Sequence, residues 1–121
     1  MKTRALIIED NERNLLLEKD LLESSGFEVF TAIDAKSGIL IAGKEIPDII
    51  LMDMRLPDMR GTDAAEILRA DDATRGIPIV FVTTSIVGDE RQLIADFVNS
   101  GYISKPINTR TFAEEIKKFI K

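Results

Sequence analysis

Residues 49–61 read IILMDMRLPDMRG, from Ile49 to Gly61, and this stretch decides the fold. Its first four residues are apolar without interruption, which is typical of a short strand covered on both faces. Asp53 follows directly, and the chain then turns through Pro57 and Asp58 towards Gly61. A lone carboxylate at the end of a buried strand is costly to remove from water. The stretch therefore predicts a strand whose terminal acid shares a pocket with a cation from elsewhere in the chain.

The length and composition are those of one globular domain. The chain has 121 residues, of which 45% are hydrophobic and 31% charged, the usual balance of a folded domain with a real core. Its longest apolar runs fall far short of the roughly 18 residues of a membrane span. The N-terminus leads straight into a predicted strand, so no signal peptide is expected. The absence of cysteine excludes disulfides and thiolate metal sites, and we expect a cytoplasmic location.

The charge makes nucleic acid and membrane surfaces unexpected partners. The net charge is −5 and the pI about 4.8, whereas nucleic-acid binders present a basic patch. The basic residues are scattered, and only Lys117, Lys118 and Lys121 cluster. We interpret these lysines as the last turn of a helix, where cations complement the dipole.

Strand-like and helix-like stretches alternate along the whole chain. The predicted strands are Arg4–Glu9, Glu28–Ile33, Asp48–Asp53, Ile77–Thr83 and Tyr102–Ser104. The predicted helices are Glu12–Ser25, Ala35–Glu45, Asp63–Asp71, Asp89–Asn99 and Thr109–Lys121. Asn11 and Asn108 are candidate N-caps of the first and last helices, while Gly26 and Pro47 end the first and second.

Five such strand–helix units predict an α/β fold. Right-handed crossovers between consecutive strands give one five-stranded parallel sheet with helices on both faces. The continuous apolar runs ALII, IILM and IVFV agree, because central parallel strands are covered on both sides. We expect one three-layer domain over residues 1–121.

Polar residues gather at the predicted carboxyl ends of the strands, where open α/β sheets bind ligands. Glu9 and Asp10 follow the first strand, Asp53 the third, Thr83 ends the fourth, and Lys105 follows the fifth. Taken singly, each has an ordinary explanation: a helix-start cluster, a loop acid, a strand filler and an exposed turn. Their joint placement on one edge of the sheet favours a site.

The residue types of this predicted site suit phosphoryl chemistry. Three neighbouring carboxylates repel one another unless a cation intervenes, and an all-oxygen set without His or Cys suits Mg²⁺. A carboxylate nucleophile, a magnesium ion, the Lys105 ammonium and the Thr83 hydroxyl together can take up a phosphoryl group.

The motifs IIEDN (7–11), DIILMDMRLPDMRG (48–61), IPIVFVTT (77–84) and YISKPI (102–107) resemble, over the whole chain, the receiver domain of bacterial two-component response regulators. The resemblance implies a flavodoxin-like fold and phosphorylation of Asp53 by a histidine kinase or histidine phosphotransfer protein. It further implies that Asp10 binds Mg²⁺ directly, Glu9 through water, and Arg55 through its backbone carbonyl. Self-phosphorylation and hydrolysis of the phosphoaspartate would be the only chemistry, without turnover of another substrate.

The same resemblance assigns the remaining motif residues. It implies that Thr83 and Lys105 contact the phosphoryl group, that Thr83 and Tyr102 form a switch in which the aromatic ring rotates inward, and that Pro106 follows a cis peptide bond. The alternative for Tyr102 is a half-buried strand aromatic with no switching role.

Several positions vary from the commonest pattern of the family. Thr84 stands where Ala or Gly is usual, and Phe97 and Val98 where small residues are more familiar. Arg55 and Ser85 occupy variable positions that influence phosphoryl lifetime. No catalytic group is missing, so chemical competence is expected while the lifetime stays open.

Helix surfaces suggest how partners are bound. Leu15, Leu16 and Leu17 cannot all face the sheet on one stripe, so we predict that Leu15 or Leu16 is exposed. The resemblance implies that the exposed leucine docks against the phosphodonor's helical bundle, as the first helix does in this family. The alternative is a wide core face with an incidental exposed leucine. In the last helix, Phe112, Ile116 and Phe119 are predicted to be core.

The sequence stops at Lys121, where its last predicted helix ends, so we expect no DNA-binding output domain and signalling through a downstream protein target. EDNERN and YISKPI look most like the stand-alone cell-cycle and polarity regulators, although an excised receiver of a hybrid kinase would read the same. The protein would be a monomer or a phosphorylation-dependent dimer.

Three other functions explain part of the pattern. A haloacid-dehalogenase-type enzyme also uses an aspartate nucleophile, but it needs a second acid where Arg55 stands. A binding module that no longer takes phosphate is opposed by the intact set Asp10, Asp53, Thr83 and Lys105. A flavodoxin-type cofactor binder would need a phosphate-cradling first loop, whereas EDNERN is acidic.

Overall fold

The computed structural model describes residues 2–84, 88, 90–97 and 99–120, and it confirms the predicted α/β fold. Five parallel strands form one sheet in the order β2-β1-β3-β4-β5. The strands are β1 (Arg4–Ile8), β2 (Glu28–Ala32), β3 (Ile49–Met52), β4 (Ile79–Thr83) and β5 (Ser100–Ser104). The helices are α1 (Glu12–Ser24), α2 (Ala35–Glu45), α3 (Gly61–Ala70), α4 (Glu90–Asp96) and α5 (Phe112–Lys117).

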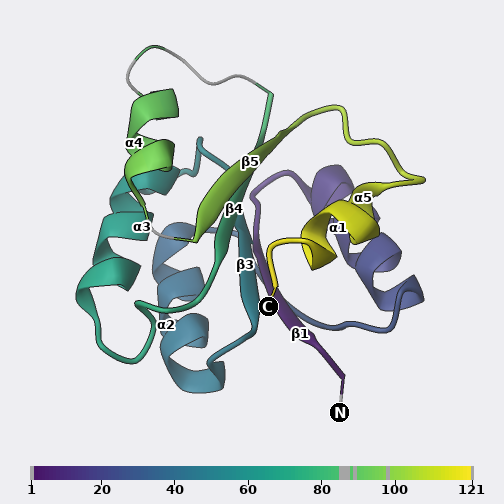
Figure 1. Ribbon diagram of the computed structural model, residues 1–121, viewed down its shortest axis with the longest axis horizontal. Coiled ribbons are helices and arrows are strands. Elements are labelled where there is room, and N and C mark those ends of the chain that lie inside the picture. The colour runs from purple at the N-terminus through teal and green to yellow at the C-terminus, as the bar shows by residue number, and fades with distance from the viewer. Residues whose placement is uncertain (1, 85–87, 89, 98, 121) are drawn as a thin grey trace.

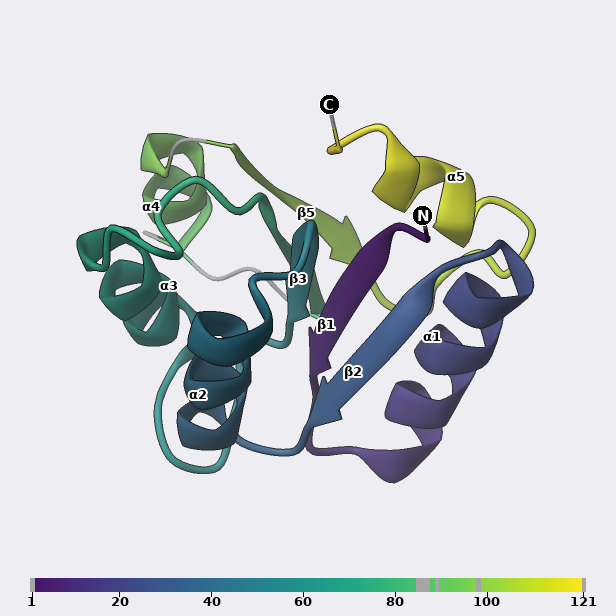
Figure 2. The same ribbon diagram turned by 90° about the horizontal axis from the view of Figure 1, so that it is seen from below.

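The helices cover the two faces of the sheet, with α1 and α5 on one side and α2, α3 and α4 on the other (Figures 1 and 2). Alternate residues of β1 supply the two cores: Leu6 and Ile8 pack on the α2–α4 side, while Ala5 and Ile7 pack on the α1–α5 side. All four are fully buried. This explains the uninterrupted apolar run, because a strand covered on both faces has no side open to water.

The strand order places a topological switch point at the carboxyl ends of β1 and β3. β1 pairs with β2 on one side and with β3 on the other, so the chain leaves the two strands in opposite directions. Ile8 lies opposite Met52 in this register. The backbone N–H of Asp53 donates to the Ile8 carbonyl at 3.1 Å. The residues that follow β1 and β3 are therefore neighbours, which is where ligands bind in such sheets.

Most element boundaries differ from prediction by one to three residues. Asn11 caps α1 as predicted, since its side chain accepts from the backbone N–H of Asn14 at 3.1 Å. β5 begins two residues earlier than predicted, at Ser100. α4 covers only part of the predicted Asp89–Asn99, in which Asp89 and Val98 lie outside the described residues; Asn99 has a left-handed backbone (φ 56°).

The last helix is the largest departure, and the prediction that Asn108 caps it was wrong. Its side chain accepts from the backbone N–H of Arg110 at 3.0 Å and closes a separate turn, after which Thr111 is the N-cap of α5. The helix is thus shorter than the predicted Thr109–Lys121. Phe112 and Ile116 are fully buried on its inner face, and Phe119 packs against the same core, as predicted.

Among the residues that the structure describes, no helix is long and apolar enough to span a membrane.

Candidate functional site

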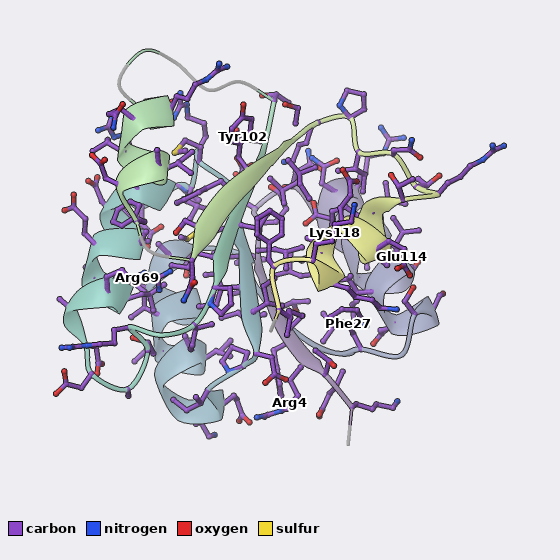
Figure 3. All side chains as sticks on the ribbon, viewed as in Figure 1. Arg4, Phe27, Arg69, Tyr102, Glu114 and Lys118 are labelled. Atoms are coloured by element: carbon purple, nitrogen blue, oxygen red, sulfur yellow. The ribbon has the colours of Figure 1, made fainter. Side chains whose placement is uncertain are left out.

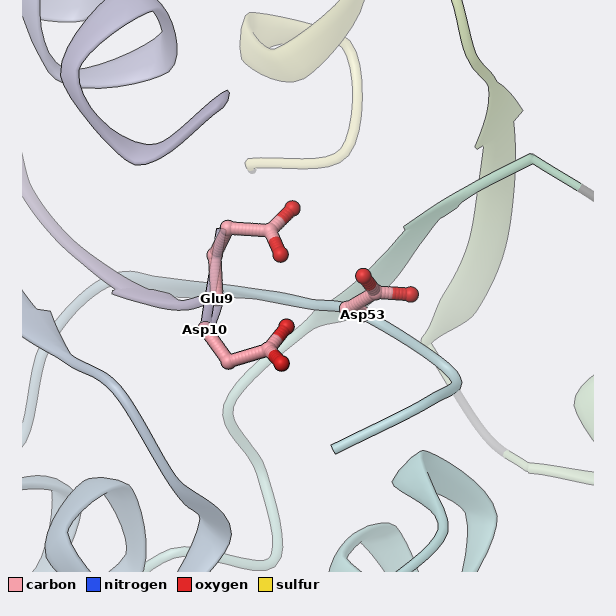
Figure 4. Close-up of side chains that lie close together, drawn as sticks. All are labelled: Glu9, Asp10 and Asp53. Atoms are coloured by element: carbon pink, nitrogen blue, oxygen red, sulfur yellow. The ribbon is translucent and has the colours of Figure 1, made fainter. Parts of the chain in front are cut away.

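Three carboxylates meet at the switch point of the sheet. Glu9 and Asp10 follow β1, and Asp53 follows β3; one oxygen of each lies within 4.8 Å of the other two (Figure 4). Glu9 is buried, Asp53 half-buried and Asp10 exposed, so the cluster opens to solvent on one side. An open group of hard oxygen donors of this kind fits Mg²⁺, which keeps several waters.

Lys105 brings a positive charge to the cluster from the far edge of the sheet. Its Nζ donates to Asp53 Oδ2 at 3.1 Å and also to Glu9 Oε1. Its backbone N–H donates to the Thr83 carbonyl at 2.8 Å, and the Lys105–Pro106 peptide bond is cis. The ammonium is the cation that the sequence required beside Asp53.

The buried charges shift one another's titration. Burial raises the pKa of Glu9, and the hydrogen bond from Lys105 opposes that rise. Burial alone would lower the pKa of Lys105, but its hydrogen bonds to Glu9 and Asp53 outweigh it and raise that pKa. Lys105 is therefore a permanent ammonium at neutral pH, aimed at the carboxylate of Asp53.

The loop after β3 is held close to the sheet by two anchors. Gly61 lies so near Asp53 that an added Cβ would be 2.5 Å from the Asp53 carbonyl oxygen, so only glycine fits there. Asp58 accepts from the backbone N–H groups of Ala35 and Lys36 at 2.9 Å each. Those bonds lower the pKa of Asp58. They also tie the loop to the N-terminus of α2 across 22 and 23 residues of sequence.

Thr83 and Tyr102 lie on the two edge-side strands near the site. Thr83 is buried at the end of β4, one strand from Asp53. Tyr102 is 38% exposed on β5 and lies beside α4 (Figure 3), where the Arg91 guanidinium carbon is 5.8 Å from its ring centre. A ring with this much exposure has room to adopt another rotamer.

Arg55 has a partner that the sequence did not reveal. Its Nη1 and Nη2 donate to the two carboxylate oxygens of Glu90 at 2.6 and 3.0 Å. Its backbone N–H donates to Asp53 Oδ1 at 3.2 Å. The side chain thus joins the loop beside Asp53 to the first residue of α4. The binding of Mg²⁺ by the Arg55 carbonyl stays a prediction.

Glu18 is a buried acid that sequence analysis missed. It is 2% exposed, on the inner face of α1, and with Lys105, Leu17 and Ile107 it lines a cavity of about 90 Å³. Burial raises its pKa to about 8, and the negative charge of Glu9 adds to the rise. Its position was visible in principle, because Leu15, Glu18 and Leu22 recur at the i, i+3, i+7 spacing of a core-facing stripe.

The structure describes only some of the positions at which this sequence varies from the commonest family pattern. Thr84 is exposed, Phe97 packs against the α2–α4 side of the core, and Ser85 and Val98 lie outside the described residues. On α1, Leu16 is 50% exposed, which confirms that one of the two named leucines is on the surface, while Leu15 packs against the core. Leu17 is exposed as well.

Comparison with known proteins identifies the family. The model of the response regulator receiver domain matches residues 5–117. The polar-differentiation response regulator DivK of Brucella anthropi is 36% identical over 120 residues, which cover 99% of this chain and 98% of that protein. The chain therefore belongs to the receiver domains of two-component response regulators.

Solved structures of receiver domains and response regulators have the same fold as this chain. The receiver domain of the sensor histidine kinase PA1611 from Pseudomonas aeruginosa has a TM-score of 0.87 and 28% identity, with 98% of each chain covered, and holds a magnesium ion in its active-site cleft. The chemotaxis response regulator CheY4 of Vibrio cholerae has a TM-score of 0.91 at 23% identity, covering 99% of this chain and all of that one, which shows the shared fold. Receiver domains of this family interact with histidine kinases or phosphotransfer proteins.

Proposed function

We propose that residues 1–121 form one receiver domain that accepts a phosphoryl group on Asp53 from a histidine kinase or phosphotransfer protein and signals through contacts with a downstream protein. The observation that carries this proposal is the convergence of three segments on one space: Glu9 and Asp10 after β1, Asp53 after β3, and Lys105 after β5. Asp53 is the member of this set that is half-buried, in contact with the ammonium and still open to a donor.

In the proposed transfer, a carboxylate oxygen of Asp53 attacks the phosphorus of a phosphohistidine. An O–P bond forms while the P–N bond breaks, and its electron pair returns to the imidazole nitrogen, which takes up a proton from solvent. Lys105, already 3.1 Å from Asp53 Oδ2, donates to a phosphoryl oxygen and offsets the negative charge that the group brings. The Thr83 hydroxyl donates to another oxygen. Attack of water on phosphorus, with return of the electron pair to the carboxylate, reverses the modification and releases phosphate.

Mg²⁺ is the proposed cofactor, which Asp10, Asp53 and the Arg55 carbonyl would hold directly and Glu9 through water. When bound, it neutralises repulsion between the incoming phosphoryl group and the acids. The donor set supports this, because three oxygens within 4.8 Å suit a small hard cation.

The proposed output is a change at the surface of α4, β5 and α5, with Thr83 and Tyr102 as its switch. The half-exposed ring of Tyr102 beside Arg91 supports that role. The exposed Leu16 and Leu17 would dock the donor's helical bundle. The cytoplasmic location, the oligomeric state and the absence of an output domain stay predictions.

A haloacid-dehalogenase-type reaction has less support. It needs an acid two residues after the nucleophile, and that position is Arg55, whose side chain is bound to Glu90.

Acetyl phosphate with Mg²⁺, followed by intact mass measurement, tests the proposal. Wild type should gain the mass of one phosphoryl group, and Asp53→Asn should not. Asp63→Asn, which removes an exposed carboxylate from α3, is the matched control and should behave as wild type. A wild-type chain that gains no phosphoryl group from acetyl phosphate or from a panel of histidine kinases would contradict it.

A further inference from the structure

The Arg55–Glu90 ion pair links the loop beside Asp53 to α4. Glu90 is the first residue of α4, and both of its carboxylate oxygens accept from the guanidinium, at 2.6 and 3.0 Å. This fork geometry is the strongest arrangement available to an arginine and a carboxylate. The two residues are 35 positions apart in sequence, so the pair is a tertiary contact between the loop after β3 and α4, and not a contact within one helix.

The two partners differ in freedom. The Glu90 side chain is 6% exposed, whereas that of Arg55 is 48% exposed. The arginine is therefore the partner that can move without rebuilding the core. Its charge is already within electrostatic reach of Asp53, which together with Glu90 raises the pKa of Arg55.

The start of α4 also contacts Tyr102. Arg91, the next residue after Glu90, places its guanidinium 5.8 Å from the centre of the Tyr102 ring. The first turn of α4 is thus held on one side by the loop beside Asp53 and on the other by the aromatic side chain of β5.

We propose that Arg55 exchanges partners: it binds Glu90 while Asp53 is unmodified and binds the phosphoryl group once Asp53 is phosphorylated, which releases the first turn of α4. This inference rests on the proposed function and adds to it a third phosphoryl-binding side chain, besides Lys105 and Thr83, and a route from the phosphoryl group to α4.

Charge and geometry favour the exchange. A phosphoryl group brings about two negative charges and three acceptor oxygens to Asp53, and arginine binds phosphate in the same two-pronged way as it binds a carboxylate. The exchange has an energetic consequence, because breaking the resting pair opposes binding of the phosphoryl group. Weakening Glu90 as an acceptor must therefore strengthen binding of a phosphoryl analogue, by the free energy that the resting pair contributed.

Beryllium trifluoride with Mg²⁺, a noncovalent mimic of a phosphoryl group on aspartate, tests this by NMR titration. Glu90→Gln should bind it about three- to tenfold more tightly than wild type, the range for a partly exposed pair with charged hydrogen bonds. Asp96→Asn removes an exposed carboxylate from the other end of α4 and should match wild type. In an Arg55→Gln background, Glu90→Gln should have no effect, because the side chain that exchanges is gone.

A second readout follows the arginine itself. The Nε–Hε signal of Arg55 should move on addition of the analogue in wild type, and in the conservative variant Arg55→Lys the tightening by Glu90→Gln should shrink. Amide spectra of each variant verify that it is folded. Equal affinity of wild type and Glu90→Gln within twofold, or weaker binding by Glu90→Gln, would overturn the partner exchange alone. A folded wild type that binds no analogue and accepts no phosphoryl group would overturn the proposed function as well.

Discussion

Replacement of Glu18 by glutamine should stabilise the protein, and more so as the pH rises. Glu18 is 2% exposed, and the charges of Glu9, Asp53 and Lys105 act on it. Within the described part of the chain its carboxylate makes no hydrogen bond or ion pair at contact distance. Glutamine keeps the shape and cannot ionise.

The size of the effect follows from the pKa of Glu18. Burial raises that pKa from 4.5 to about 8. In the unfolded chain the carboxyl loses its proton near pH 4.5, while in the folded protein it keeps it to about pH 8. Below pH 4.5 the carboxyl is protonated in both states, so the burial of Glu18 does not destabilise wild type. As the pH rises towards 8, the unfolded state is increasingly favoured and the free energy of unfolding of wild type falls. At about 1.36 kcal/mol for each pH unit, the loss between pH 4.5 and 7 is about 3 kcal/mol.

Urea denaturation of wild type and Glu18→Gln, in EDTA and at several pH values, measures the difference. The free energy of unfolding of Glu18→Gln relative to wild type should rise by about 3 kcal/mol from pH 4.5 to pH 7. Asp20→Asn, which removes an exposed carboxylate from the same helix, controls for a general effect of charge on α1. A difference that stays constant across this range would refute the buried, protonated Glu18.

Three further predictions concern the loop and the ammonium. Gly61→Ala should destabilise the fold by about 1–3 kcal/mol, because its Cβ would meet backbone at 2.5 and 3.1 Å. Gly43→Ala, with open space around it, should stabilise α2 by about 0.5–1 kcal/mol in the same denaturation assay; the opposite order would be inconsistent with the close approach. Asp58→Ala and Asp34→Ala each remove an acceptor for backbone N–H groups at the start of α2 and should each lower the free energy of unfolding. Only Asp58→Ala should also weaken Mg²⁺ binding by calorimetry; equal weakening would argue against the loop anchor. Lys105→Met should tighten Mg²⁺ binding, because a competing cation is gone, yet slow phosphorylation by acetyl phosphate about 100-fold; a rate like that of wild type would remove the ammonium from the proposed chemistry.

The sequence predicted those parts of the site that lie at strand ends. The carboxyl ends of parallel strands share one edge of a sheet, so Asp53 after β3 and Lys105 after β5 could be expected together from order alone. The apolar runs also located the central strands, because a strand that is buried on both faces is apolar at every position and stands out in the sequence.

Contacts between side chains on different helices, strands and loops could not be predicted from the sequence. The Arg55–Glu90 pair depends on where α4 begins, and the tie from Asp58 to α2 depends on how the loop after β3 folds back; neither spacing is periodic. The predicted start of α5 was wrong for a local reason. The Asn108 side chain accepts from the backbone N–H of Arg110 and closes a turn before the helix, so it does not cap the helix. Glu18 was overlooked because an acid in a leucine-rich helix is usually solvated.

Reduction of the acetyl-phosphate-treated protein with borohydride, followed by peptide mass spectrometry, tests the central claim most directly. Borohydride converts an aspartyl phosphate to homoserine and leaves a free carboxylate unchanged, so it marks the residue that carried the phosphoryl group. Homoserine should occur at position 53 and only when Mg²⁺ and the phosphodonor were both present. Homoserine at position 10, or at another acid with none at 53, would contradict the account.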